Sequence, residues 1–246
     1  MDKTNNEAGD VRWKTFYKFA AVAALLIVLV GLTDTVTSML GGETRVNSAV
    51  SVTEWFALFQ SNRLGALGNL GLFNILTLSL GIPLYIALCN LHWKNHPSFA
   101  TLSVVLFAMG TAIYISSNTV FSMLAISDQY ALADEAQKSL LEAAGRALLA
   151  RGADLTPGTF MGFLFTQSAA LMMAFVLLRG GIFSKVTAWL GIAGFGLMLV
   201  FFTIAAFVPS QFTTAMMISA PGGLLLIAYH ILLARRLFQL GRSNLQ

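Results

Sequence analysis

The chain has 246 residues, of which 57% are hydrophobic and 11% are charged, and its formal net charge is +4. Soluble domains carry about a quarter charged residues, and one water-soluble core cannot bury so much apolar surface. The composition therefore excludes a soluble globular protein and predicts that lipid surrounds the chain. The basic residues are spread over the ends of apolar segments, so nucleic acid is not expected as a partner.

Six apolar segments are long enough to cross a bilayer, which takes about 20 residues at about 1.5 Å per residue. Backbone groups in lipid must be hydrogen-bonded within the chain, so all six segments are predicted to be helices. We therefore expect an all-α fold, an integral membrane bundle of six transmembrane helices with an amphipathic outer helix between the third and fourth. The predicted spans are residues 19–40, 64–91, 99–125, 159–179, 186–208 and 213–234.

Lysine and arginine are distributed unequally between the two sides of this predicted bundle. The side with both termini carries ten of them: Lys3, Arg12, Lys14, Lys18, Lys94, Arg179, Lys185, Arg235, Arg236 and Arg242. The other side carries five: Arg45, Arg63, Lys138, Arg146 and Arg151. The positive-inside rule then predicts a multi-pass protein of the inner (cytoplasmic) membrane with both termini in the cytoplasm. We expect a cytoplasmic segment 1–18, a membrane domain 19–238 and a cytoplasmic tail 239–246.

The first apolar run follows a basic flank, as the apolar region of a signal peptide does. At residues 19–40 it is too long for such a region, and no small-residue cleavage pattern follows it convincingly. We therefore expect a retained first transmembrane helix.

The loop after this helix contains a short amphipathic segment at 52–59. Its aromatic residues Trp55, Phe56 and Phe59 are of the kind that lies at headgroup level in membranes. The segment is predicted to anchor the chain at the membrane interface, with a partner-binding surface as the alternative.

Glycine and proline mark places where the predicted helices pack closely or bend. Small residues spaced three apart let a neighbouring helix approach, and proline removes a backbone donor and bends a helix. A bend is predicted at Gly81 and Pro83, and a kink or local unwinding at Pro221; packing and kinking without a binding role is the alternative. The closely spaced glycines are Gly65, Gly68 and Gly71 in the second span and Gly191, Gly194 and Gly196 in the fifth.

The outer helix is predicted at 129–151, between the third and fourth spans. Charges of alternating sign recur every four residues on one face, and small apolar residues recur on another. The apolar face is expected to lie on the membrane surface or across the mouth of the bundle, and the charged face is expected to be solvated. The charged residues are Asp134, Lys138, Glu142 and Arg146, and the apolar ones are Ala133, Ala136, Leu140, Ala144 and Ala147.

Six runs of this sequence have a recognisable pattern. They are Asn62-Arg63-Leu64-Gly65, Leu72-Phe73-Asn74-Ile75-Leu76, Ile82-Pro83-Leu84-Tyr85, Ile113-Tyr114-Ile115-Ser116-Ser117-Asn118, Ser127-Asp128-Gln129-Tyr130-Ala131 and Leu141-Glu142-Ala143-Ala144-Gly145. These runs resemble a known bacterial membrane-protein family, the domain of unknown function numbered four-three-eight-six. The resemblance covers about residues 15–238 and is densest in the middle of the chain. It implies a multi-span α-helical protein of bacterial origin and no particular activity.

Polar side chains within the predicted spans gather toward the end of the bundle away from the termini. Polar groups in a membrane are costly, so each is a candidate for function. We predict an outward-facing polar cavity with Asp34 at its centre and the outer helix as its cap; hydrogen bonding between helices without any ligand is the alternative. The candidate ligand-binding residues are Asp34, Asn69, Asn74, Tyr114, Asn118, Gln167 and Ser219.

The sequence offers few groups for catalysis or metal binding. His92, His96 and His230 are predicted at the cytoplasmic ends of the helices, opposite the polar residues, and Cys89 is a single cysteine that excludes a disulfide or a cysteine cluster within the chain. No paired carboxylates, His-Glu-x-x-His motif or phosphate-binding loop is present. We therefore predict no catalytic residue and no metal site, and the sequence identifies no cofactor.

These features favour a non-catalytic protein that binds or senses a lipid or small amphiphile in the cavity. Two alternatives are an accessory or structural subunit of a larger membrane complex and a transporter or membrane enzyme that uses Asp34. The expected partners are membrane lipids, other membrane proteins or further copies of the chain.

Overall fold

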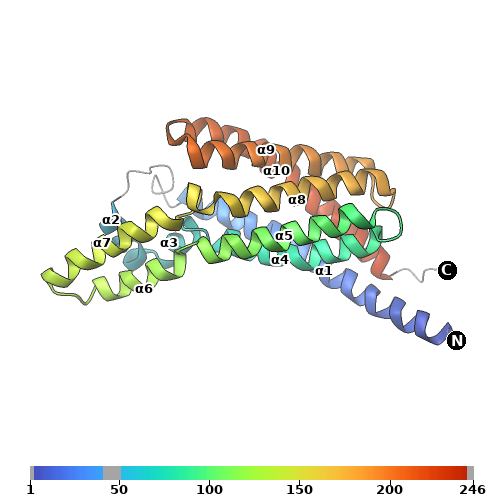
Figure 1. Ribbon diagram of the computed structural model, residues 1–246, viewed down its shortest axis with the longest axis horizontal. Helices are drawn as coiled ribbons and strands as arrows, with labels where there is room; N and C mark the ends of the chain where they lie inside the picture. Colours follow the sequence, from blue (N-terminus) through green and yellow to red (C-terminus); the bar gives the residue numbers. More distant parts are fainter. Residues whose placement is uncertain (1–2, 41–50, 243–246) are drawn as a thin grey trace.

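The structure is a computed structural model that describes residues 3–40 and 51–242, with side chains described for 13–37 and 51–242. Within these residues the fold is all-α, without strands (Figure 1). Both ends of the chain lie at one end of an elongated helical bundle, which we call the termini end. The opposite end is called the distal end.

Six long helices form the bundle, and each contains a segment long and apolar enough to cross a membrane. This confirms the predicted number of spans and indicates a multi-pass membrane protein. The helices are α1 (Lys3–Leu40), α4 (Leu72–His92), α5 (Pro97–Ser117), α8 (Pro157–Gly180), α9 (Lys185–Phe207) and α10 (Phe212–Arg242).

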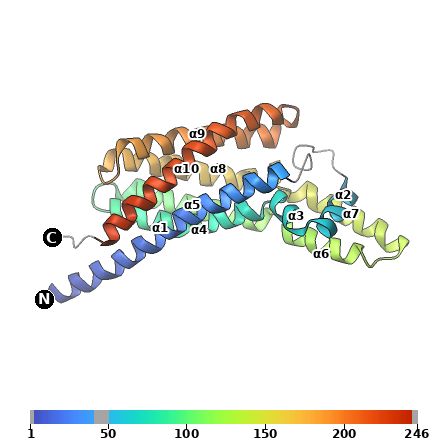
Figure 2. The ribbon, with the colours of Figure 1, turned by 180° about the vertical axis from the view of Figure 1, so that it is seen from behind.

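The six helices form a closed ring in chain order. Each packs against the next, and α10 returns to pack against α1, so that the first and last helices lie side by side (Figure 2). Glycines permit two of the closest contacts, because a Cβ at Gly110 of α5 would meet the backbone of α8, and one at Gly191 of α9 would meet Tyr229 of α10. The ring encloses an interior to which every long helix contributes.

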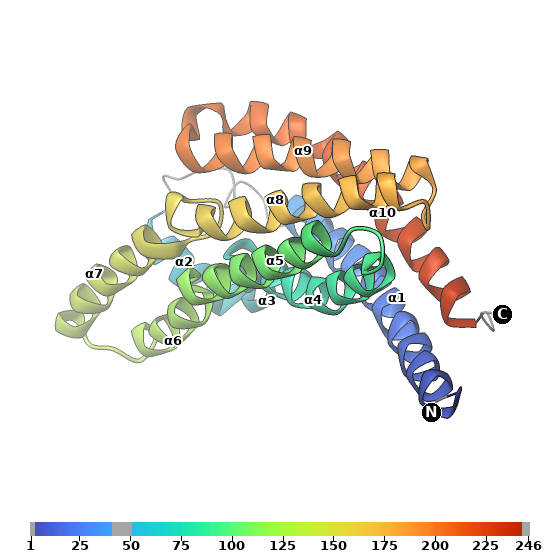
Figure 3. The same cartoon turned by 45° about the vertical axis from the view of Figure 1, so that its right-hand side comes forward.

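Four shorter helices form a second, smaller unit at the distal end (Figure 3). We call α2 (Val52–Ser61), α3 (Arg63–Asn69), α6 (Val120–Tyr130) and α7 (Glu135–Gly152) the distal unit. A short turn of 3-10 helix, η2 (Pro209–Gln211), joins α9 to α10 at the same end. Capping boxes at Ser51 with Glu54, and at Asp134 with Gln137, define where α2 and α7 begin. The buried apolar residues of the distal unit form a cluster distinct from that of the bundle, and Ile75 of α4 packs against both clusters.

Two predicted spans are each broken into two helices. The span 64–91 is interrupted at Leu70 and Gly71, where Gly71 has a φ of 104°, in the left-handed region that favours glycine.

The span 99–125 is interrupted after Ser117. There the Asn118 side chain accepts a hydrogen bond from the Val120 backbone N–H, 2.9 Å away, and the backbone N–H of Thr119 bonds to the end of α7. Both breaks lie where the bundle meets the distal unit.

Other helix boundaries and bends in the structure also differ from the predicted ones. The outer helix predicted at 129–151 begins at Glu135, because Gln129 and Tyr130 end α6 and a turn follows them. The predicted unwinding at Pro221 is wrong, since α10 continues through that residue, and α4 likewise continues through Pro83. Of the three glycines at 65, 68 and 71, only Gly71 faces another long helix; Gly65 and Gly68 lie against nearby side chains of their own segment.

The aromatic residues of α2 are buried within the distal unit. Trp55, Phe56 and Phe59 pack there with residues of α3 and α6, so the predicted membrane-interface anchor is wrong. The apolar face predicted on α7 does not pack against other helices, so its predicted place on the membrane surface stays a prediction. Gly145 lies against α2, whereas Ala136, Leu140, Ala144 and Ala147 are exposed.

Candidate functional site

A cavity of about 230 Å³ lies inside the ring of six long helices. Every one of these helices contributes to its wall, because each turns one side toward the shared interior. The lining residues are Ile27, Val28, Gly31, Asp34, Thr35, Phe73, Asn74, Thr77, Leu78, Gly81, Leu84, Tyr85, Phe107, Phe163, Thr166, Gln167, Ala170, Phe195, Met198, Phe202, Gly223, Leu226, Ile227 and His230. Most of them are apolar, and polar groups are few.

Aromatic rings stiffen the apolar walls. Tyr85 of α4 stacks on Phe107 of α5, with ring centroids 4.0 Å apart, and Phe163 of α8 stacks on Phe202 of α9 at 3.9 Å. Offset or stacked aromatic pairs add about 0.5–1.5 kcal/mol beyond the area that they bury. The two stacked pairs therefore stabilise the contacts between neighbouring helices at the cavity wall.

Three of the predicted residues, Asp34, Asn74 and Gln167, line the cavity. Asn74 lies in the first turn of α4, and Tyr85 lies eleven residues further along the same helix. At 1.5 Å per residue the cavity is therefore about 16 Å long along α4. Asp34 and Asn74 mark its distal end, and Tyr85 and His230 mark its other end.

Two polar atoms on the cavity wall have no hydrogen-bond partner among the described residues. They are the side-chain amide oxygen Oε1 of Gln167 and the hydroxyl of Tyr85, and both atoms are buried. Tyr85 as a whole is only 4% exposed. Burying a polar group without a partner costs about 1–3 kcal/mol. A bound molecule with a polar group could satisfy either atom.

His230 also lies on the cavity wall, where its Nδ1 is hydrogen-bonded to the carbonyl of Leu226 at 2.8 Å. His230 therefore lines the same cavity as Asp34 and Asn74, whereas it was predicted to lie apart from the polar residues. His92 is fully buried near the end of α4, with Nδ1 bonded to the carbonyl of Leu88 at 2.9 Å. Across the described residues, no three His, Cys, Asp or Glu side chains are placed to share a metal ion.

Two further predicted residues, Tyr114 and Asn118, belong to a polar network at the distal end. The Tyr114 hydroxyl donates to Oδ1 of Asp154 at 2.7 Å, and the Asn74 amide donates to Oδ2 of the same carboxylate at 2.9 Å. The Asn118 amide donates to the carbonyl of Leu70 at 2.8 Å. Asn74 lines the cavity and also binds Asp154, so the network lies at the distal end of the cavity.

The network joins the loop before α8 to both helix breaks. Asp154 lies between α7 and α8, Leu70 lies at the break before α4, and Asn118 lies at the break after α5. Gly71 allows this approach, because a Cβ there would meet Tyr114, Asn118 and Asp154. Leu155, the residue after Asp154, has a φ of 58°, which is uncommon for a residue with a side chain.

The remaining predicted residues, Asn69 and Ser219, do not line the cavity. Asn69 is buried in α3, in the distal unit. The Ser219 hydroxyl donates to the carbonyl of Met216 in its own helix, at 2.9 Å. Both were placed at a suitable depth by the sequence, but depth alone does not fix the direction in which a helical side chain points.

The sequence analysis missed Asp154, Tyr85 and His230. Asp154 has a recognisable signal, since it is a carboxylate directly before a predicted span whose neighbouring spans carry amide and hydroxyl donors at the same depth. Tyr85 and His230 lie in the termini half of the bundle, where no polar cluster was predicted.

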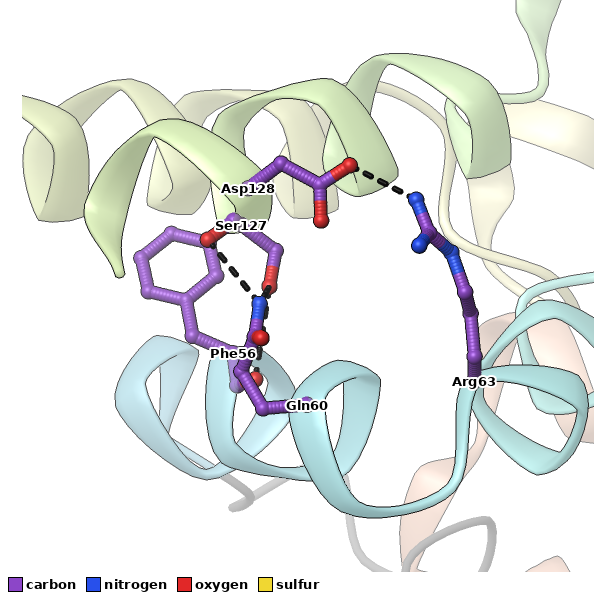
Figure 4. Close-up of polar contacts among 5 residues, drawn as sticks. All are labelled: Phe56, Gln60, Arg63, Ser127 and Asp128. Carbon is purple, nitrogen blue, oxygen red and sulfur yellow. Dashed lines mark hydrogen bonds and ion pairs between the residues drawn. The ribbon is translucent and has the colours of Figure 1, made fainter. Parts of the chain in front are cut away.

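Runs that carry the family resemblance meet in the distal unit. Figure 4 shows Arg63 of α3 and Asp128 of α6 pointing toward each other, and their charged groups are 2.7 Å apart. Beside them the Gln60 amide donates to the Ser127 side chain and carbonyl, both at 3.3 Å, and the Ser127 hydroxyl donates to the Phe56 carbonyl at 3.3 Å. These hydrogen bonds and the ion pair thus connect α2 and α3 with α6, which lies about 65 residues further along the sequence.

Comparison of the chain with protein-family models, curated proteins and solved structures finds no match. The family resemblance therefore rests on the sequence runs quoted above.

Proposed function

We propose that this membrane protein binds a lipid or small amphiphile in the cavity at the centre of its six-helix ring. Small-molecule sites are typically concave and mostly apolar, with a few polar groups that fix the orientation of the ligand. The cavity has this composition, and two stacked aromatic pairs form part of its wall. Its volume of about 230 Å³ is below the usual range of about 300–1,000 Å³, which favours a single-chain lipid or small amphiphile.

The observation that carries the proposal is the buried, unsatisfied Gln167 Oε1 on the cavity wall. Buried polar groups in folded proteins are almost always hydrogen-bonded. A ligand that donates to Gln167 would remove the cost of burying its oxygen. Asp34 and Asn74 lie at the distal end of the same cavity, so the polar head of an amphiphile belongs there, with its chain between the phenylalanine rings.

The proposal can be tested by filling the cavity and measuring the ligand that remains with the purified protein. Gly223 lines the cavity, and a Cβ built there meets nothing within 4 Å. Gly223→Leu is therefore expected to fold and to occupy part of the space. Mass spectrometry of organic extracts should find a near-stoichiometric small amphiphile in the unaltered protein, and at least about tenfold less of it in this variant, the loss that about 1.4 kcal/mol of affinity produces.

Gly196→Leu is the matched control. Gly196 also lies in a long helix and has the same open space around its Cβ, but it is absent from the cavity wall. This variant should retain the amphiphile. An equal amount in all three proteins, or no amphiphile in any of them, would contradict the proposal.

One observation favours a second function, that of an accessory subunit. The face of α7 formed by Ala136, Leu140, Ala144 and Ala147 is exposed, and Leu140 is 71% exposed. Apolar faces that nothing covers often mark protein–protein contacts. A stoichiometric membrane-protein partner that copurifies with the chain, without any bound amphiphile, would favour this function. Ion-dependent uptake into vesicles that is lost in Asp34→Asn would instead favour a transporter.

A further inference from the structure

A second hollow of about 240 Å³ lies between α5 and α8 at the termini end of the bundle. It shares no lining residue with the central cavity. Its lining residues are His96, Phe99, Met172, Phe175, Val176 and Arg179. Phe99 is 58% exposed and Phe175 is 49% exposed, so two large aromatic side chains of the hollow face the surroundings of the bundle.

The polar residues of this hollow are both nitrogen donors. Arg179 lies in the last turn of α8 and is exposed, and His96 directly precedes α5. Neither side chain makes a hydrogen bond or an ion pair with any described residue. A free guanidinium group presents N–H donors in a fork that fits two oxygens of a phosphate.

At the termini end of the bundle, the charged side chains that the structure describes are all basic. Eight lysine and arginine side chains of the described residues belong to the termini end: Lys14, Lys18, Lys94, Arg179, Lys185, Arg235, Arg236 and Arg242. The described carboxylates, at 34, 54, 128, 134, 135, 142 and 154, all belong to the distal unit or the distal half of the bundle. No described carboxylate is therefore available to pair with Arg179.

We propose that this hollow binds an anionic phospholipid of the leaflet on the termini side. The phosphate accepts hydrogen bonds from Arg179 and His96, and one acyl chain lies along Phe99, Met172 and Phe175. Basic pockets between transmembrane helices are a known way of holding anionic headgroups. This site is separate from the central cavity, and the proposal does not depend on the function assigned to that cavity.

The test compares two lipids and two variants by native mass spectrometry of the purified full-length protein. Phosphatidylglycerol should remain bound in preference to phosphatidylcholine. Arg179→Gln should weaken phosphatidylglycerol binding about fivefold, the effect expected of one basic group at a membrane surface, and should leave phosphatidylcholine binding unchanged. Arg235→Gln is the matched control, because Arg235 is exposed at the same end but lies outside the hollow.

Three outcomes would overturn the proposal. If Arg179→Gln and Arg235→Gln weaken phosphatidylglycerol binding equally, the lipid is attracted to the basic end of the bundle in general and not to a specific site. Equal retention of the two lipids would show that the headgroup charge is not recognised. Displacement of the phospholipid by soluble glycerol phosphate at similar concentration would show that the acyl chain contributes nothing. The unfolding temperature, measured in parallel, should be the same for both variants because both side chains are exposed.

Discussion

The carboxylate of Asp154 organises the polar residues at the distal end of the bundle. It accepts hydrogen bonds from the fully buried Tyr114 and from Asn74, which come from two different long helices. Hydrogen bonds to a charged group contribute about 1.5–3 kcal/mol, more than bonds between neutral groups. Asp154 thereby fixes the loop before α8 against α4 and α5, and it holds Asn74 at the end of the cavity.

Removal of the Tyr114 hydroxyl should therefore lower the stability of the fold. Tyr114→Phe keeps the ring and its packing but removes one donor from Asp154, so we expect the free energy of unfolding to fall by about 2 kcal/mol. Tyr130→Phe is the matched control, because the Tyr130 hydroxyl also donates to a carboxylate, that of Glu142 at 2.9 Å, but at a half-buried position in the distal unit. Tyr130→Phe should lower the free energy of unfolding by less than about 1 kcal/mol. Denaturant unfolding in detergent measures both, and equal losses would contradict this role of Asp154.

Among the elements, α2 shows how an amphipathic pattern leaves its partner undefined. The spacing of Trp55, Phe56 and Phe59 requires one apolar face, and either a membrane interface or another helix can cover such a face. In the fold, α3, α6 and α7 cover it. The exposed pair of Arg63 and Asp128 adds little stability by comparison, because ion pairs in solvent contribute about 0–1 kcal/mol.

Truncation of Phe56 should therefore destabilise the distal unit. Phe56 is 1% exposed, and Phe56→Ala should cost about 3–5 kcal/mol. Hydrogen exchange should show faster exchange in α2, α6 and α7, with unchanged protection in the six long helices, because the buried apolar residues of the two units form distinct clusters. Leu140→Ala, at a position that is 71% exposed, should change stability by less than about 0.5 kcal/mol. Unchanged exchange in Phe56→Ala would restore the interpretation of α2 as a membrane anchor.

The whole molecule is a closed ring of helices, in which the described charged side chains at the termini end are all basic and every described carboxylate lies toward the distal end. The positive residues at the termini end and the carboxylates at the distal end follow from the order of the six helices in the chain. This asymmetry underlies the proposed orientation, with the termini in the cytoplasm and the distal unit outside.

The orientation can be tested by labelling single cysteines in intact cells. Cys89→Ala removes the native thiol, which is buried. In that background, Leu140→Cys in the distal unit should react with a membrane-impermeant maleimide added outside. Asn95→Cys, in the exposed turn between α4 and α5, should react only after the membrane is permeabilised. The reverse pattern would show that the protein is inserted the other way round.

The sequence by itself determined the six spans and the all-α fold, because lipid leaves the backbone no partner other than its own helix. It also indicated that Asp34, Asn74 and Gln167 lie on long helices of the bundle, since that follows from their positions within the predicted spans. The rotation of each helix about its axis depends on its neighbours, so only the tertiary structure placed Gln167 on the cavity and Ser219 away from it. The breaks at Gly71 and Asn118 were likewise decided by tertiary contacts. They are held by residues distant in sequence, and Asp154, which joins them, lies in a loop whose place no local pattern defines.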